Sequence, residues 1–186
     1  RNGLKSFKEE AAKLMKLHDI IGTVNVFAIF EENNTAYLVM EYLDGCTLAQ
    51  MLKEKKKMPV EEAWKMIRPV IRSLQEIHKN NLIHRDITPD NIFITKSGEL
   101  KVLDFGSARY SALAQNKSIS VIVKQGYAPP EQYQLYKDQG PWTDVYSLAA
   151  TIYKMITGKV PEDSITRMVK DTLEAPSALG ITITKS

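Results

Sequence analysis

The feature that most constrains this chain is a polar run of eight residues that is followed, after a short gap, by a triplet. The run reads His84-Arg85-Asp86-Ile87-Thr88-Pro89-Asp90-Asn91, and the triplet reads Asp104-Phe105-Gly106. Residues 92–94 and 100–103, which lie between them, are mostly apolar and favour two short strands. Such strands would present the carboxylates of Asp86 and Asp104 and the amide of Asn91 on neighbouring loops.

The composition is that of a soluble globular domain, because 44% of the 186 residues are hydrophobic and 25% are charged. The net charge of +3 includes no basic stripe interleaved with aromatic residues, so we expect no nucleic-acid partner. The single cysteine, Cys46, cannot form an internal disulfide, which fits a reducing compartment and a cytoplasmic location. No apolar run approaches the ~20 residues of a membrane-spanning helix, so no membrane segment is expected in this chain.

Hydrophobic periodicity predicts strands at residues 24–30 and 35–42, joined by a turn at residues 31–34. Helices are expected at residues 7–17 and 47–56, and a longer one between Pro59 and Asn80. The longer helix carries an apolar stripe made of Ala63, Ile67, Val70, Ile71, Leu74 and Ile77. Strands that come first and helices that follow are typical of an α+β fold.

Residues 142–156 also have helical periodicity, and the pattern predicts one buried apolar face. That face would consist of Val145, Leu148, Ala149, Ile152 and Met155. Residues 107–125 show neither the helical nor the strand period, which is typical of a functional loop. Residues 162–186 are weakly helical at first and then ambiguous.

The pattern H-R-D-x-x-x-x-N followed by D-F-G resembles the catalytic and metal-binding loops of protein kinases, and within that family the bacterial serine/threonine kinases. Residues 126–131 are similar to the family's A-P-E element, with Pro129 in place of alanine. Residues 143–148 resemble the core helix whose buried aspartate, here Asp144, holds the backbone of the catalytic loop. Residues 37–43 resemble the last strand of the small lobe and the hinge.

This resemblance implies a protein kinase-like two-lobe fold of the α+β class. Residues 1–43 would form a partial small lobe, a helix plus two strands, together with the hinge. Residues 44–186 would form a partial, mainly helical large lobe, with the catalytic loop at residues 84–91 and the activation segment at residues 104–131. Both parts would belong to one partial kinase domain.

The resemblance also implies ATP and Mg²⁺ as ligands and a protein as the substrate. Asp86 would accept the proton of the substrate hydroxyl, and Asn91 and Asp104 would bind the metal ions. The residues implied at the nucleotide are Glu10, which pairs with a lysine in the active state, Met40 as gatekeeper, Glu41 and Leu43, whose backbone bonds adenine, and Phe93 beneath the adenine ring.

Some features of the family have no counterpart in these residues. The Gly-rich loop and the lysine of V-A-I-K come before the helix that begins near Phe7, and only six residues precede Phe7 here. The last helices of the large lobe, with the arginine that pairs with Glu131, are missing as well. We therefore expect the chain to correspond to the middle of a kinase domain and to bind ATP poorly on its own, with Glu10 unpaired.

One departure concerns the catalytic site itself. Serine/threonine kinases have a lysine two residues after the catalytic aspartate and a threonine before the G-Y-x-x-P-E element, whereas this chain has Thr88 and Lys124 at those positions. We expect Lys124 to reach across and supply the cation that position 88 lacks, while Thr88 hydrogen-bonds Asp86. Arg85 could also bind a phosphoserine at position 118 or 120, although both serines could equally be plain loop residues.

Two other functions stay open on the sequence alone. A pseudokinase that acts as a binding scaffold would explain Thr88 and the missing lysine, but it has no need to keep Asp86, Asn91 and Asp104 together. A small-molecule kinase of the aminoglycoside type shares an aspartate–asparagine loop, but it needs no P-P-E element. A protein serine/threonine kinase is the reading that the motifs favour.

Overall fold

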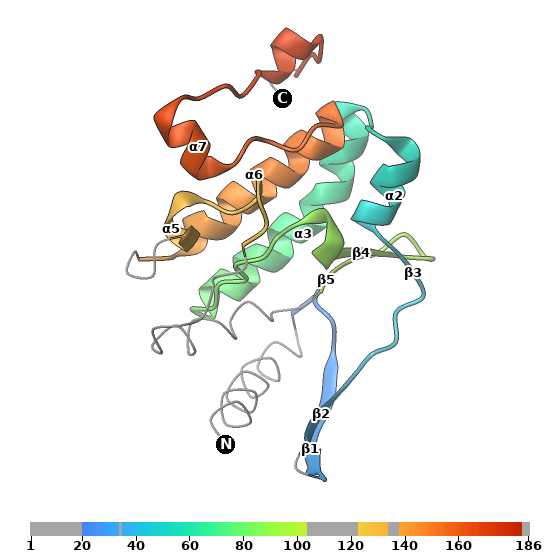
Figure 1. The fold of residues 1–186 in the computed structure, drawn as a ribbon. Helices are drawn as coiled ribbons and strands as arrows, with labels where there is room; N and C mark the ends of the chain where they lie inside the picture. The colour runs from blue at the N-terminus through green and yellow to red at the C-terminus, as the bar shows by residue number, and fades with distance from the viewer. Residues whose placement is uncertain (1–19, 34, 104–122, 134–137, 184–186) are drawn as a thin grey trace.

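The computed structural model describes residues 20–33, 35–103, 123–133 and 138–183 (Figure 1). The helix predicted at residues 7–17, which includes Glu10, lies outside the described residues. Asp104, Ser118 and Ser120 lie outside them as well.

An antiparallel hairpin forms the first part of the described chain. Strands β1 (Val26–Glu32) and β2 (Thr35–Met40) pair from Val26↔Met40 to Glu32↔Thr35, which confirms the two predicted strands. The rings of Phe30 and Tyr37 stack across the pair with their centroids 5.0 Å apart, a contact that favours this register. Figure 1 shows this hairpin extending away from the helices.

A second sheet has three strands, two of which lie between residues 84–91 and Asp104 in the sequence. It contains β3 (Gly45–Thr47), β4 (Ile92–Thr95) and β5 (Leu100–Val102) in the order β3-β4-β5. The last two are the predicted strands, whereas β3 was not predicted because a three-residue strand shows no measurable period. One face is buried in the core through Ile92, Ile94, Leu100 and Val102. Phe93 and Lys101, which are cross-strand partners, share the opposite face.

Helices α2 (Leu48–Lys55) and α3 (Val60–Lys79) follow the sequence prediction closely. Thr47 caps α2 through a reciprocal capping box with Gln50, and Pro59 precedes the first turn of α3. The predicted stripe of α3 faces the core, with Ile71 only partly buried. This apolar face packs α3 against α6 and β5.

Helix α6 (Pro141–Thr157) packs against α3, but its buried face differs from the predicted one. Val145 is 59% exposed and Ala149 is also exposed, so both assignments were wrong. The buried face instead includes four polar residues: Thr143, Asp144, Ser147 and Thr151. Asp144 and Thr151 are satisfied there by hydrogen bonds with the catalytic loop. Thr143 bonds Glu131, and Ser147 bonds the carbonyl of Thr143.

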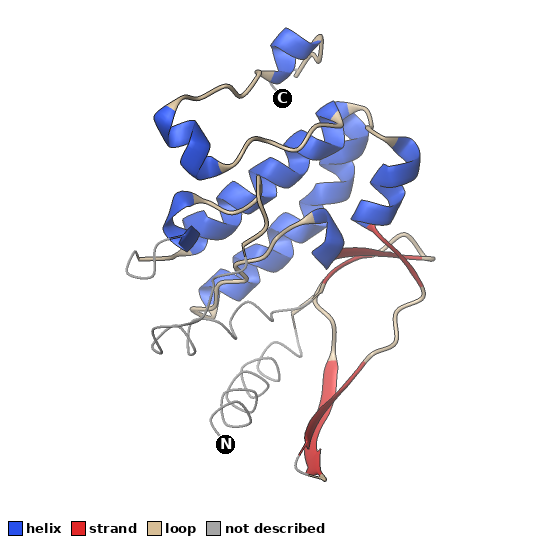
Figure 2. Cartoon of the chain, viewed as in Figure 1, coloured by secondary structure: helices blue, strands red, loops and turns tan. Residues whose placement is uncertain are grey.

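The remaining elements are short. They are α5 (Pro130–Tyr133), α7 (Ser164–Val169), and the 3₁₀ turns η1 (Pro89–Asn91) and η2 (Pro176–Leu179). Figure 2 shows the hairpin of β1 and β2 extending away from the helices, while the three-stranded sheet lies beside α2 and α3. The elements form the predicted α+β arrangement. No helix in the described ranges is long and apolar enough to cross a bilayer.

Candidate functional site

The backbone of the catalytic loop is held by the fully buried carboxylate of Asp144 in the first turn of α6. Its Oδ2 accepts a hydrogen bond from the His84 N–H at 2.9 Å, and its Oδ1 accepts one from the Arg85 N–H at 2.7 Å. The same Oδ2 lies 2.7 Å from Nε2 of His78 on α3. A buried carboxylate is stable only when such partners replace water, so these contacts fix the loop on α6. The predicted role of Asp144 is confirmed.

Arg85 is held in an unusual backbone conformation. Its φ is +70°, in the left-handed region that residues other than glycine rarely adopt. The Arg85 N–H is bound by Asp144, and its carbonyl accepts a hydrogen bond from Gln132 Nε2 at 2.6 Å. Burial lowers the pKa of the Arg85 guanidinium, and the nearby Asp144 carboxylate opposes that change. Helix α6 makes one more contact with the loop, from Thr151 Oγ1 to the carbonyl of Ile87 at 3.3 Å.

The His84 imidazole connects the catalytic loop to the end of β5. Its Nε2 lies 2.8 Å from the carbonyl of Leu103, and its Nδ1 accepts a hydrogen bond from the Asp86 N–H at 3.3 Å. A neutral imidazole that carries its proton on Nε2 satisfies both contacts. The Leu103 N–H in turn donates to the carbonyl of Asn91 at 2.8 Å. The strand that leads to Asp104 is therefore joined to both ends of the catalytic loop.

Asp86 and Asn91 are in direct contact. The Asn91 amide nitrogen donates to Asp86 Oδ2 at 2.6 Å and to the Asp86 carbonyl at 2.9 Å. Because Nδ2 is engaged in this way, the amide oxygen of Asn91 is the atom that can meet a cation. A carboxylate paired with an amide oxygen is a ligand set that suits Mg²⁺.

The metal site that the resemblance implies is only partly within the described residues. No group of three or more His, Cys, Asp or Glu side chains that could hold a metal occurs in the part of the chain that the structure describes. The second expected ligand, Asp104, lies outside that part. The oxygen chemistry of Asn91 fits the ion that the sequence predicts.

Lys124 contacts the catalytic loop at the position predicted from the exchanged residue types. Its Nζ donates to Thr88 Oγ1 at 3.3 Å and to Asp90 Oδ2 at 2.7 Å. Thr88 is 1% exposed, whereas the side chain of Lys124 is 40% exposed. The predicted hydrogen bond between Thr88 and Asp86 is not formed among the described residues; the Thr88 hydroxyl accepts one from Lys124.

The four described residues expected at the nucleotide are Met40, Glu41, Leu43 and Phe93. Met40 ends β2 and is 48% exposed, and Phe93 lies on the face of β4 that points away from the core. The Glu41 N–H donates to the carbonyl of Asn25 at 2.9 Å, which leaves the Glu41 carbonyl as the group that can accept from an adenine amine.

The Glu41 carboxylate makes its own contacts. It accepts hydrogen bonds from Lys101 Nζ at 3.0 Å and from the Asn25 N–H at 3.1 Å. Burial alone would raise the pKa of Glu41, but these hydrogen bonds lower it below its ordinary value. Glu41 is therefore ionised and engaged within the protein.

Several positioning residues were missed by the sequence analysis. His78, Gln132 and Thr151 contact the loop or its anchor Asp144 from three different helices, and nothing in the sequence near them marks that role. Asp90 was inside the motif but was not assigned. Lys101 could have been noticed, because it is a charged residue between two buried apolar residues in a very short strand.

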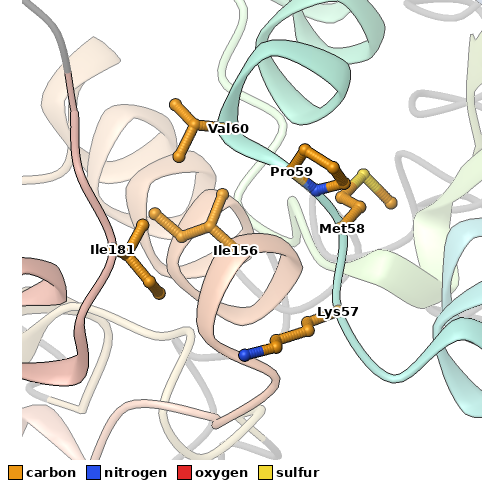
Figure 3. Close-up of a pocket in the computed structure, with 6 residues that line it drawn as sticks. All are labelled: Lys57, Met58, Pro59, Val60, Ile156 and Ile181. Carbon is orange, nitrogen blue, oxygen red and sulfur yellow. The ribbon is translucent and has the colours of Figure 1, made fainter.

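A separate apolar hollow of about 330 Å³ lies between the start of α3 and the end of α6 (Figure 3). Its lining residues are Lys57, Met58, Pro59, Val60, Ile156 and Ile181. None of the predicted site residues lines it. It therefore takes no part in the site described here.

Comparison with known proteins agrees with the geometry of the loop. The family model described as "Protein kinase domain" matches residues 3–182. A probable serine/threonine-protein kinase of Clostridium perfringens is 38% identical over 162 residues, which cover 85% of this chain and 23% of that protein. The serine/threonine-protein kinase PknA of Mycobacterium tuberculosis is 34% identical over 184 residues, which cover 95% of this chain and 42% of that protein.

A solved structure gives the same result for the fold. The chain described as the apo form of PpkA-294 matches with a TM-score of 0.79 and 34% identity, over 95% of this chain and 62% of that one. The present chain thus spans less than half the length of the curated relatives quoted above. With bacterial serine/threonine kinases as its relatives and a matching fold, the chain belongs to the protein kinase family.

Proposed function

We propose that this chain supplies the catalytic loop of a protein serine/threonine kinase, which transfers the γ-phosphate of ATP to Ser or Thr hydroxyls of a protein. One observation carries the proposal: Asp86 is held by Asn91 on a loop whose backbone is fixed by the buried Asp144. Phosphoryl transfer depends mainly on positioning and charge, and this arrangement supplies a positioned carboxylate.

In this proposal Asp86 orients the attacking hydroxyl and accepts its proton. The Asn91 amide, which donates to Asp86 Oδ2, leaves the other carboxylate oxygen for the hydroxyl. Asn91 and Asp104 would hold Mg²⁺, which neutralises the charge of the phosphates when it is bound. Met40, Phe93 and the backbone of Glu41 and Leu43 would surround the adenine.

Lys124 is the proposed source of positive charge at the transferring phosphate. Its contacts with Thr88 and Asp90 support this role, because they hold the ammonium group beside the loop that carries Asp86. Electrostatic stabilisation depends on the position of a charge and not on the segment that provides it.

A protein substrate is favoured over a small molecule because residues 126–133 form a braced platform. Ser164 Oγ donates to the carbonyl of Ala128 at 2.7 Å, and Thr143 Oγ1 donates to Glu131 Oε1 at 2.9 Å. The hydroxyl of Tyr133 also bonds the carboxylate of Asp163. An extended peptide needs such a rigid surface beside the catalytic loop, whereas a small substrate does not.

The remaining parts of the proposal concern organisation. Residues 1–43 would contribute to the small lobe and hinge, and residues 44–186 to the large lobe of one kinase domain. We propose a cytoplasmic enzyme with ATP and a protein as partners and without a nucleic-acid partner. A binding scaffold without catalysis is the second candidate, and Thr88 in the usual lysine position is the observation that favours it.

The test is a phosphotransfer assay on the full-length gene product with radiolabelled ATP, Mg²⁺ and a general protein substrate. We expect Asp86→Asn to lower kcat by about 10²–10⁴-fold, because the amide cannot accept the proton. The same substitution at an exposed aspartate outside the site, Asp138→Asn, serves as the matched control and should keep full activity. Wild-type protein without Mg²⁺-dependent transfer would instead support the scaffold.

A further inference from the structure

An ion pair connects the residue after the gatekeeper position to the strand that leads to Asp104. Lys101 Nζ on β5 lies 3.0 Å from Glu41 Oε1 and donates to the carbonyl of Thr23 at 3.4 Å. The two side chains are only 17% and 20% exposed. They are 60 residues apart in the sequence, so the contact joins segments that the chain itself does not hold together.

Asn25 extends this contact on the Glu41 side. Its N–H donates to Glu41 Oε1 at 3.1 Å, and its side-chain amide donates to Glu41 Oε2 at 3.3 Å. The Glu41 N–H returns a hydrogen bond to the Asn25 carbonyl at 2.9 Å. Both oxygens of the carboxylate therefore accept hydrogen bonds from protein donors, which hold the Glu41 side chain within the protein.

The Lys101 side is tied to the catalytic loop through the residues that follow it. The Val102 N–H donates to the carbonyl of Gly22 at 2.7 Å, and the Leu103 N–H donates to the carbonyl of Asn91 at 2.8 Å. The Leu103 carbonyl lies 2.8 Å from Nε2 of His84. Any movement of β5 would therefore move the loop that carries Asp86 relative to the hinge.

We propose that the Glu41–Lys101 ion pair is a positioning element that fixes the distance between the adenine-binding backbone and the catalytic and metal-binding loops. The inference rests on the proposed function, because it assigns the pair a role in ATP binding. Neither side chain would touch the reacting atoms. The pair would act by keeping the Glu41 carbonyl and β5 in one arrangement.

A second lysine–carboxylate pair provides a matched comparison. Lys96 Nζ lies 2.7 Å from Asp44 Oδ2 beside the same sheet, but these side chains are 76% and 58% exposed. Water screens such a pair strongly, whereas the less exposed Glu41–Lys101 pair keeps more of its interaction. Because the two pairs have the same charged groups but differ in exposure, Asp44→Asn and Lys96→Met are suitable controls.

The experiment is a double-mutant cycle in the full-length gene product with Glu41→Gln, Lys101→Met and the double variant. We expect each single variant to raise the KM for ATP about 5- to 10-fold with kcat changed by less than about threefold, since only positioning is lost. The double variant should be no worse than the worse single variant, because the two residues act as a unit. Asp44→Asn and Lys96→Met should leave the KM within about twofold of the wild type.

A second measurement does not depend on activity. Hydrogen exchange at the amides of Glu41 and Val102 should become at least about fivefold faster in both single variants, because the segments that they join would open more often. If the wild type shows no phosphotransfer but the single variants still show faster exchange, the proposed function is refuted and the positioning pair is not. Unchanged exchange, additive effects on the KM, or equal effects in the controls would overturn the inference.

Discussion

At the scale of the single residue, Lys124 is the proposed source of positive charge at the transferring phosphate. Its ammonium group lies 2.7 Å from Asp90 Oδ2 and 3.3 Å from Thr88 Oγ1, so it sits between an exposed carboxylate and a buried hydroxyl. The contact with Asp90 holds the lysine beside the catalytic loop.

Lys124→Ala should lower kcat by about 10²-fold or more, because the transferring phosphate loses a preorganised cation. The exchanged double variant, Thr88→Lys with Lys124→Thr, should recover part of that loss, since the positive charge returns to the same region. Steady-state kinetics of the full-length gene product measure both. Turnover at the wild-type rate in Lys124→Ala would exclude this role for the lysine.

At the scale of the element, α6 acts as the anchor of the catalytic loop. Its buried polar face reaches the loop at two places, through Asp144 to the N–H groups of His84 and Arg85, and through Thr151 to the carbonyl of Ile87. Periodicity predicted the extent of α6 and placed Leu148, Ile152 and Met155 correctly toward the core. It missed the polar part of the buried face, because it scores apolar residues and cannot detect polar groups that are paired internally. Asp144 was assigned correctly only through its motif.

Asp144→Asn tests the anchor with an isosteric change. The amide places an N–H group against the N–H donors of the loop, so we expect a loss of about 2–4 kcal/mol in the free energy of unfolding. Urea denaturation measures that loss, and the phosphotransfer assay should show a parallel fall in kcat. The exposed Asp138→Asn should change the urea midpoint very little, and an equal effect of the two substitutions would contradict the anchoring role.

At the scale of the whole molecule, the predictable parts were those with a strong local pattern. The strands β1 and β2 and the stripe of α3 all follow from periodicity. The contacts of Lys101 with Glu41 and of Gln132 with Arg85 could not be predicted, because they join distant segments through single side chains. Such contacts depend on the finished tertiary structure and leave no periodic signal.

The tyrosines of the platform predict how the whole molecule responds to alkaline pH. Burial, with a further contribution from the Asp90 carboxylate, raises the pKa of Tyr127 to about 12. Because the folded pKa lies above the ordinary value of 10.0, this contribution to stability is complete below pH 10 and is lost as the pH rises toward 12. The pKa of Tyr133 is raised as well, by burial and by Asp163, so it acts in the same direction.

Tyr127→Phe should therefore flatten the fall in stability between pH 8 and pH 11 by about 1 kcal/mol, although Tyr133 keeps part of the slope. Urea midpoints at the two pH values measure the difference. Tyr42→Phe is the control, since that side chain is 92% exposed. Identical slopes for wild type and Tyr127→Phe would show that ionisation of Tyr127 does not oppose folding.

The two backbone hydrogen bonds that join Leu103 to the catalytic loop have a consequence for the residue types allowed at position 103. Leu103 is bound to the catalytic loop through its backbone N–H and carbonyl, and its side chain takes no part in either hydrogen bond. Any residue type except proline, which lacks the N–H group, can therefore supply both hydrogen bonds at position 103. His84 has no such freedom, because it makes its contact with the Leu103 carbonyl through its ring.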